Sequence, residues 1–406
     1  MRVAKGEGHR RWSALALGSI AMFVAAPGQT FVVAVFMEAM ASGTGVGSGL
    51  FSALFSLATL VSSVSSVLLG RVIDGAGLRW AWLVAALGMA VACGTASTAT
   101  GVALTFVALT LLRSFGQASF PLVSTVLVAR SFGRRRGLAM AVTRFGLTAA
   151  LILMPPLSAA LIAAFGWRQA WLAIGASALL LIVPLALGVR REPRPGSPAP
   201  SRPGMVRRRP HAIRPVARLG DLPLPTPSAR RLLFVSAGPP LVTTGVMLHA
   251  VPMLNGVGLG PTQAALALSV CGAASGVGTV VAGGVADRLS TRTLLTGMAG
   301  LLAAGSALLV VPVPAAGYGS YAILGFAIGL FNVLSASLWP RVYGLAGLGK
   351  VQGMAFAAQL ASTAVGALPL AVSVSVSGSY SAGVLTLAGF AVATAAVAAR
   401  WRDPEA

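Results

Sequence analysis

Long apolar stretches recur along the chain, and short polar connections separate them. A helix that crosses a membrane needs about 20 predominantly apolar residues, and twelve stretches of this chain approach or exceed that length. The pattern predicts an all-α polytopic membrane protein with twelve transmembrane helices. We expect the spans at residues 13–38, 47–69, 80–99, 102–129, 137–164, 170–189, 232–254, 262–285, 293–312, 317–339, 351–376 and 381–399.

Basic residues are confined to alternate connections. The connections after spans 1, 3, 7, 9 and 11 contain no Lys or Arg, and the one after span 5 contains only Arg168. The even-numbered connections and both termini carry the rest of the basic residues outside the spans. Because cytoplasmic loops are enriched in Lys and Arg, we expect both termini to be cytoplasmic and the chain to lie in the inner (plasma) membrane.

Composition supports a lipid environment and argues against other partners. Charged residues make up 9% of the chain, against about 25% in soluble proteins, and hydrophobic residues make up 56%. The net charge of +22 is explained by topology, and no nucleic-acid-binding motif accompanies it. Cys93 and Cys271 lie in separate apolar stretches without a CxxC motif, so we predict no disulfide, metal or cofactor. The first apolar stretch is too long for a cleaved signal peptide, whose apolar core has about 7–15 residues.

One long segment interrupts the pattern and divides the chain. Residues 190–231 contain 11 Arg and 10 Pro, a composition that cannot bury enough apolar surface to order itself. We therefore predict an N-terminal six-helix bundle (1–189), a flexible basic cytoplasmic linker (190–231) and a C-terminal six-helix bundle (232–406). The linker acts as a charged tether that fixes topology or, alternatively, binds anionic lipid headgroups.

The two bundles repeat each other in sequence. Gly70-Arg-Val-Ile-Asp74 in the first corresponds to Gly283-Gly-Val-Ala-Asp287 in the second. Arg130-Ser-Phe-Gly133 likewise corresponds to Arg341-Val-Tyr-Gly344. Duplicated halves are typical of transporters whose binding site lies between the halves near the membrane midplane.

Two motifs carry a family resemblance. Residues 70–79, GRVIDGAGLR, resemble the G-x-x-x-D-x-x-G-x-R/K signature of the major facilitator superfamily, and Arg113-Ser-Phe-Gly116-Gln117 resembles its R-x-x-Q/G-G/Q element with the last two residues transposed. The resemblance covers nearly the whole chain. It implies two pseudo-symmetric bundles, a small-molecule substrate and transport by alternating access, and we expect a monomer.

A narrower likeness is to monocarboxylate and organic-anion porters. Pro27-Gly-Gln-Thr-Phe31, His249-Ala-Val-Pro252 and Leu338-Trp-Pro-Arg-Val-Tyr-Gly344 carry it. One departure qualifies it, because spans 8 and 11 lack the basic residue that such porters often keep. Span 5 in turn lacks the G-x-x-x-G-P motif of drug/proton antiporters.

Ionisable side chains within the spans are the first candidates for substrate binding, because each costs at least about 2.5–3.5 kcal/mol at the membrane centre. Arg113 lies roughly 16 Å from the outer end of span 4, at about 1.5 Å per residue. It would attract an anion or, alternatively, bond carbonyls freed by Pro121. Arg144 lies closer to the cytoplasm, where it could instead extend to the surface.

Polar residues and one histidine complete the substrate-binding set. Gln29 matches Arg113 in depth, and Gln117 follows it by one turn. His249 would take up a proton near neutral pH or would be a hydrogen-bonded packing residue. Asn332 and Gln359 would line the site from the second half or would bond neighbouring helices.

A second set is expected to control opening on the cytoplasmic side. Asp74 and Asp287 end their spans there, and a carboxylate beside a helix N-terminus is stabilised by about 0.3–1 kcal/mol. The resemblance implies that they act as an inner latch that favours the outward-open state. The residues of this gating set are Gly70, Asp74, Arg79, Asp287 and Arg288.

These features predict a secondary active transporter. The intramembrane arginines and the scarcity of acids favour an organic anion such as a monocarboxylate. Proton symport, substrate exchange and uniport are alternative modes, and efflux of a drug-like or secondary metabolite is an alternative activity. A transporter-like membrane sensor is a more remote one. The sequence contains no HExxH or GxSxG motif that would suggest an enzyme. It also contains no GxxxxGK(S/T) loop that would suggest ATP-driven transport.

Overall fold

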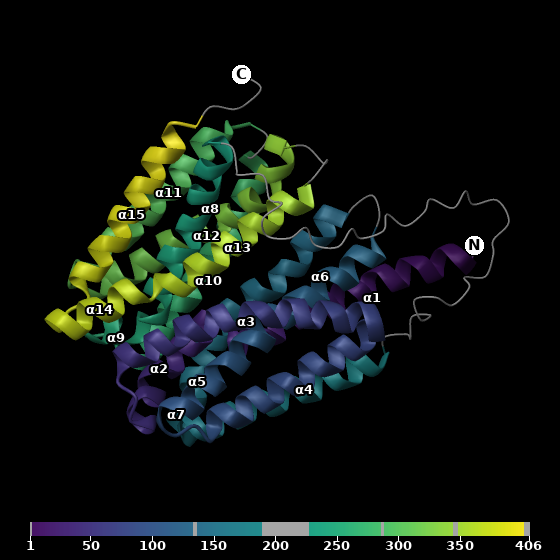
Figure 1. The fold of residues 1–406 in the computed structure, drawn as a ribbon, viewed down its shortest axis with the longest axis horizontal. Helices are drawn as coiled ribbons and strands as arrows, with labels where there is room; N and C mark the ends of the chain where they lie inside the picture. Colours follow the sequence, from purple (N-terminus) through teal and green to yellow (C-terminus); the bar gives the residue numbers. More distant parts are fainter. Residues whose placement is uncertain (1, 133–135, 189–226, 286–287, 344–347, 402–406) are drawn as a thin grey trace.

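The computed structural model describes residues 2–132, 136–188, 227–285, 288–343 and 348–401 (Figure 1). These residues form helices and short turns and contain no strand. The first half comprises α1 (Arg2–Val24), η1 (Ala26–Gly28), α2 (Thr30–Thr44), α3 (Ser48–Ala76), α4 (Leu78–Ser97), α5 (Gly101–Leu112), η2 (Arg113–Ser119), α6 (Phe120–Ser131) and α7 (Arg136–Gly188). The second half comprises α8 (Pro227–Leu248), α9 (Ala250–Asn255), α10 (Pro261–Val285), α11 (Thr291–Leu308), α12 (Pro314–Tyr343), α13 (Leu348–Gly366), α14 (Leu368–Ser377) and α15 (Ser381–Ala399).

The helices make the twelve expected passes. Nine segments of the described chain are long and apolar enough to cross a membrane, and one of them, Val142–Val183, turns at Gly166 and so provides two passes. Helices α3 and α11 provide the remaining two. Four passes consist of consecutive pieces: α1–η1–α2, α5–η2–α6, α8–α9 and α13–α14.

Several helices run past the ends of their apolar stretches. Helix α3 continues to Ala76 and includes most of the segment expected to connect spans 2 and 3. A helix satisfies its own backbone hydrogen bonds, so it need not end where lipid ends. The chain turns at Gly77, whose φ of 90° strongly favours glycine. Helix α8 begins at Pro227, inside the predicted linker; residues 189–226 lie outside the described residues.

The two halves meet at one end and diverge at the other (Figure 1). Both termini lie at the diverging ends, so we call that side of the membrane the terminal side and the opposite one the far side. The halves touch where α2 packs on α8 and α9, α3 on α13 and α14, and α7 on α10. The terminal side is the one that the charge pattern predicts to be cytoplasmic.

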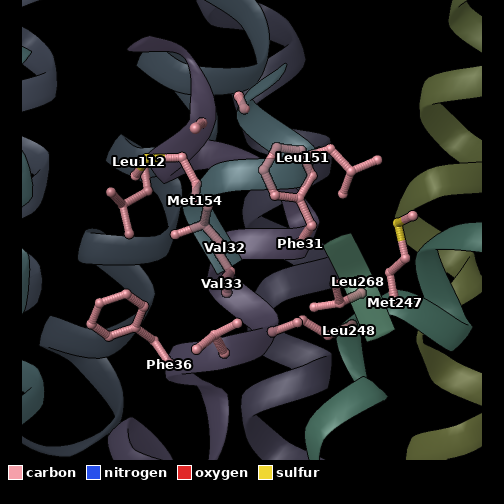
Figure 2. Packing of buried hydrophobic residues seen from close by; sticks show 14 of the residues in the cluster. Phe31, Val32, Val33, Phe36, Leu112, Leu151, Met154, Met247, Leu248 and Leu268 are labelled. Carbon is pink, nitrogen blue, oxygen red and sulfur yellow. The ribbon is translucent and has the colours of Figure 1, made fainter. Parts of the chain in front are cut away.

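The buried core reflects this arrangement. One cluster of buried side chains runs from the first half into the second, and Figure 2 shows Phe31 and Val32 of α2 near Leu151 of α7, Leu248 of α8 and Leu268 of α10. A separate cluster at the terminal side contains second-half residues only, including Leu232, Leu295 and Trp401. The halves therefore share a core toward the far side but not at the terminal side.

Candidate functional site

Span 1 and span 4 are both irregular where they pass each other. Span 1 is interrupted by the short 3-10 turn η1 around Pro27 and resumes as α2. Span 4 is wound as a π-helix, η2, in which the Phe120 N–H donates to the Phe115 carbonyl five residues back. Such wide turns are rare and occur often at functional sites. The two irregular turns are in contact.

Glycine on both helices allows this contact. A Cβ on Gly116 would overlap Gly28 Cα and would lie 2.6 Å from Gly28 N. Both clashes are with backbone, so no side-chain movement could relieve them. Gln29 adds a hydrogen bond across the same contact, from Nε2 to the Gly116 carbonyl at 3.3 Å.

Arg113 is buried within this junction. Its Nε donates to Thr59 Oγ1 at 2.9 Å, and its Nη1 donates to the Gly28 carbonyl at 3.0 Å and to Thr30 Oγ1 at 3.4 Å. The guanidinium carbon lies 4.5 Å from the centre of the Phe55 ring. The carbonyl that Arg113 meets therefore belongs to the break in span 1 and does not precede Pro121. Arg113 ties spans 1, 2 and 4 together, and its Nη2 has no partner among the described residues.

Arg144 is placed differently. It lies on α7 in the same helical row as Thr148 and Ile152, which sit against Gly276 and Gly272 of α10 in the other half. Arg144 is one turn nearer the terminal side, where the halves diverge. Its side chain is exposed and makes no hydrogen bond or ion pair with any residue of the described chain. It is therefore an available cation at the interface between the halves.

His249 lies at the far-side contact and not beside Arg113. It separates α8 from α9 and is fully buried. Its Nε2 is 2.9 Å from Ser52 Oγ of α3, and its Nδ1 is 3.1 Å from the Gly245 carbonyl. The ring lies 5.5 Å from that of Tyr380. His249 thus forms part of the seal between the halves.

A second hydrogen bond joins the halves nearby. Asn255 Nδ2 donates to Glu38 Oε2 at 2.9 Å. Burial, and to a lesser degree the Glu38 carboxylate, raises the pKa of the Tyr380 hydroxyl in the turn between α14 and α15, which keeps it protonated. The sequence signals Ser52 only weakly, through polar residues four apart at 48, 52 and 56 of an apolar span. It gives no sign of Asn255 or Tyr380.

The remaining candidates are dispersed. Asn332 and Gln359 are half-buried in the second half, and no described contact joins them to Arg113. Gln117 is half-buried, with its Oε1 enclosed and unpartnered in the described region.

The structure describes only part of the expected inner latch. Arg79 is half-buried and Arg288 is exposed. The side chain of Asp74 and all of Asp287 lie outside the described residues, as do the surroundings of Gly70. The latch therefore stays a prediction.

Two matched six-helix bundles that meet at one side of the membrane and part at the other define a membrane transporter. The family model for the Major Facilitator Superfamily matches residues 18–367. The chain therefore belongs to the Major Facilitator Superfamily and is a secondary transporter.

Individual relatives agree on the fold. Monocarboxylate transporter 13 of Bos taurus is 27% identical over 288 residues, which are 66% of this chain and 61% of that protein. The chain therefore matches less than two thirds of that relative's length. The nucleoside transporter NupG superposes with a TM-score of 0.74 at 14% identity, covering 96% of this chain and 100% of that one. A bacterial homologue of the human lysosomal transporter Spinster, in an inward-facing and occupied conformation, gives 0.68 at 12% identity, covering 96% of each chain.

Proposed function

We propose that this transporter moves a small organic anion, a carboxylate in the first instance, across the plasma membrane by alternating access. The observation that carries the proposal is Arg144. Its guanidinium has no partner within the described part of the chain and is exposed on the face of α7 that meets the other half. An anion entering between the halves would meet this charge.

Acidic groups do not compete for that cation within the described residues. Glu38 is the one acidic side chain that the structure describes, and it lies at the far side, bonded to Asn255. Arg113 adds a second positive charge, and its described partners are hydroxyls, a carbonyl and an aromatic ring. Both arginines therefore make the region between the halves attractive to negative charge.

The relatives support a carboxylate without deciding the substrate. The curated relative is named for monocarboxylates, whereas the structural neighbours include nucleoside and peptide transporters. The proposal includes proton symport as the mode of coupling. Substrate exchange is the competing mode, and a pH gradient across the membrane distinguishes the two.

Counterflow in proteoliposomes tests the substrate class. Proteoliposomes that contain the purified protein are loaded with unlabelled solute. Uptake of the labelled form is then compared for monocarboxylates, dicarboxylates, a nucleoside and a dipeptide. We expect a monocarboxylate to exchange and the neutral solutes to fail. If only neutral or drug-like solutes exchange, the anion proposal is wrong and efflux of such compounds takes its place.

Arg144 substitutions test the site. We expect Arg144→Gln to lower kcat/KM for the anion at least about tenfold, since one charge-assisted hydrogen bond contributes about 1.5–3 kcal/mol, and Arg144→Lys to retain part of the activity. Arg168→Gln is the matched control, because Arg168 stacks on Trp167 at the far-side turn and bonds the Ser97 carbonyl. Unchanged transport by Arg144→Gln would refute the assignment.

A further inference from the structure

The contact between α7 and α10 contains a hydrogen bond that one of two adjacent prolines of α7 explains. In a helix the N–H of each residue bonds the carbonyl four residues earlier, and proline has no N–H. Pro156 therefore leaves the Ile152 carbonyl without its helical donor. Ser269 Oγ of α10 donates to this carbonyl at 2.6 Å.

The fit of the other half around this carbonyl is close. A Cβ on Gly272 would lie 2.9 Å from Ile152 Cγ1 and 3.0 Å from Ile152 N. Glycine at 272 thus lets α10 approach α7 in the turn before the two prolines, and Ser269 is one turn away on the same face of α10. Ser269 and Gly272 of the second half thus supply the donor and the space for close packing, and Ile152 of the first half supplies the acceptor.

We propose that the Ser269–Ile152 hydrogen bond is a conformational lock that stabilises the state closed on the far side and breaks when that side opens. This is not a property of the substrate site, and it does not rest on the substrate being an anion.

The two partners differ in what they lose when the lock breaks. Ser269 has a second acceptor in its own helix, because its Oγ is 3.4 Å from the Ala265 carbonyl and can turn toward it. The Ile152 carbonyl has no such alternative, because Pro156 cannot donate to it. Opening the far side therefore leaves a carbonyl unsatisfied inside the membrane, and the closed state is favoured by roughly three- to tenfold, the net effect of one hydrogen bond.

The pair of prolines supplies a matched control. Pro156→Ala restores the N–H that bonds Ile152 O and so competes with Ser269. Pro155→Ala restores the N–H for Leu151 O and leaves the acceptor of Ser269 free. Both substitutions remove a proline from the same stretch of α7. The two variants therefore differ only in which carbonyl regains its helical donor. Ser269→Ala removes the donor without touching α7.

Double electron–electron resonance on the protein without substrate measures the lock. Spin labels at Ser42→Cys and Thr262→Cys report the distance between the halves on the far side, since both positions are exposed whereas native Cys93 and Cys271 are buried. We expect Ser269→Ala and Pro156→Ala each to raise the population of the far-side-open state about three- to tenfold. The double variant should match the single ones, because each change removes the advantage that this one bond gives the closed state.

Two results would overturn the proposal. One is an unchanged population in Ser269→Ala, which alters no residue of α7 and so tests the lock even if a proline variant misfolds. The other is an equal shift in Pro155→Ala and Pro156→Ala, which would assign the effect to helix bending. Loss of anion transport by Arg144→Gln with an unshifted distance distribution would concern the substrate proposal alone.

Discussion

At the scale of single residues, Arg113 shows what the position of a charged residue within a span does and does not predict. Its position in an apolar stretch predicts a charge near the membrane midplane, and the structure places the side chain fully buried. Its partners Thr59 and Gly28 are 54 and 85 residues away. No local pattern links such distant positions, so the sequence leaves open whether the guanidinium binds substrate or holds helices together.

We expect Arg113→Gln to destabilise the first half. It removes two short hydrogen bonds and leaves the Gly28 carbonyl without this donor, at a cost of about 1–3 kcal/mol, which corresponds to about 2–4 °C in melting temperature per kcal/mol for a domain of this size. Cys93 and Cys271 are buried in different halves, so a thiol-reactive dye reports each half separately in single-cysteine variants.

The Cys93 transition should shift by several degrees and the Cys271 transition by less. Equal shifts would show that the halves unfold together. No shift at all would mean that the bonds of Arg113 contribute little to folding.

At the scale of elements, hydropathy locates the spans well and their irregularities poorly. The last predicted span, 381–399, coincides with α15. Most other predicted span ends differ by a few residues from the helix ends, because a helix can continue beyond the apolar stretch that crosses the membrane. The π-helix η2 was not predicted. It lies where η1 packs against Gly116, and that packing is a property of the folded pair and not of span 4 alone.

The junction of η1 and η2 can be tested with one methyl group. Gly116→Ala places a Cβ against Gly28 backbone, so the helices must separate and the Arg113–Gly28 and Gln29–Gly116 bonds must lengthen. We expect strongly reduced transport and a lower melting temperature, by the route that makes overpacked cores lose about 1–3 kcal/mol.

Gly94→Ala is the control for this substitution. A Cβ there meets nothing within 4 Å, and alanine is a better helix former than glycine by about 1 kcal/mol. Normal folding and transport in Gly116→Ala would show that the two spans do not need this close approach.

At the scale of the whole molecule, the sequence repeat predicts two halves but not their mutual arrangement. One sequence serves every state of a transporter, so only the structure shows which ends touch. Here the described interhalf hydrogen bonds Glu38–Asn255 and Ser52–His249 seal the far side, and Ile152–Ser269 joins the halves nearer the middle of spans 5 and 8. Glu38 and His249 were recognisable as candidates in the sequence, whereas Ser52, Asn255 and Ser269 were not, because each matters only through its partner.

Cross-linking this seal should arrest the cycle. In a background with Cys93 and Cys271 replaced, Glu38→Cys with Asn255→Cys joins positions whose native side chains lie 2.9 Å apart. Oxidation or a short bifunctional reagent should abolish counterflow, and reduction of a disulfide should restore it. Each single-cysteine variant serves as the control. Full transport by a completely cross-linked sample would mean that this contact persists throughout the cycle.

The far-side connections of the described chain are very short. The turns at residues 45–47, 98–100, 256–260, 309–313 and 378–380 and the bend at Gly166 are all that joins the helices there. Such turns leave little chain for a protease, an antibody or an inserted epitope tag to engage. Reagents that recognise the native molecule from that side will therefore have to bind the rim formed by the helix ends, and their binding will change whenever the two halves tilt.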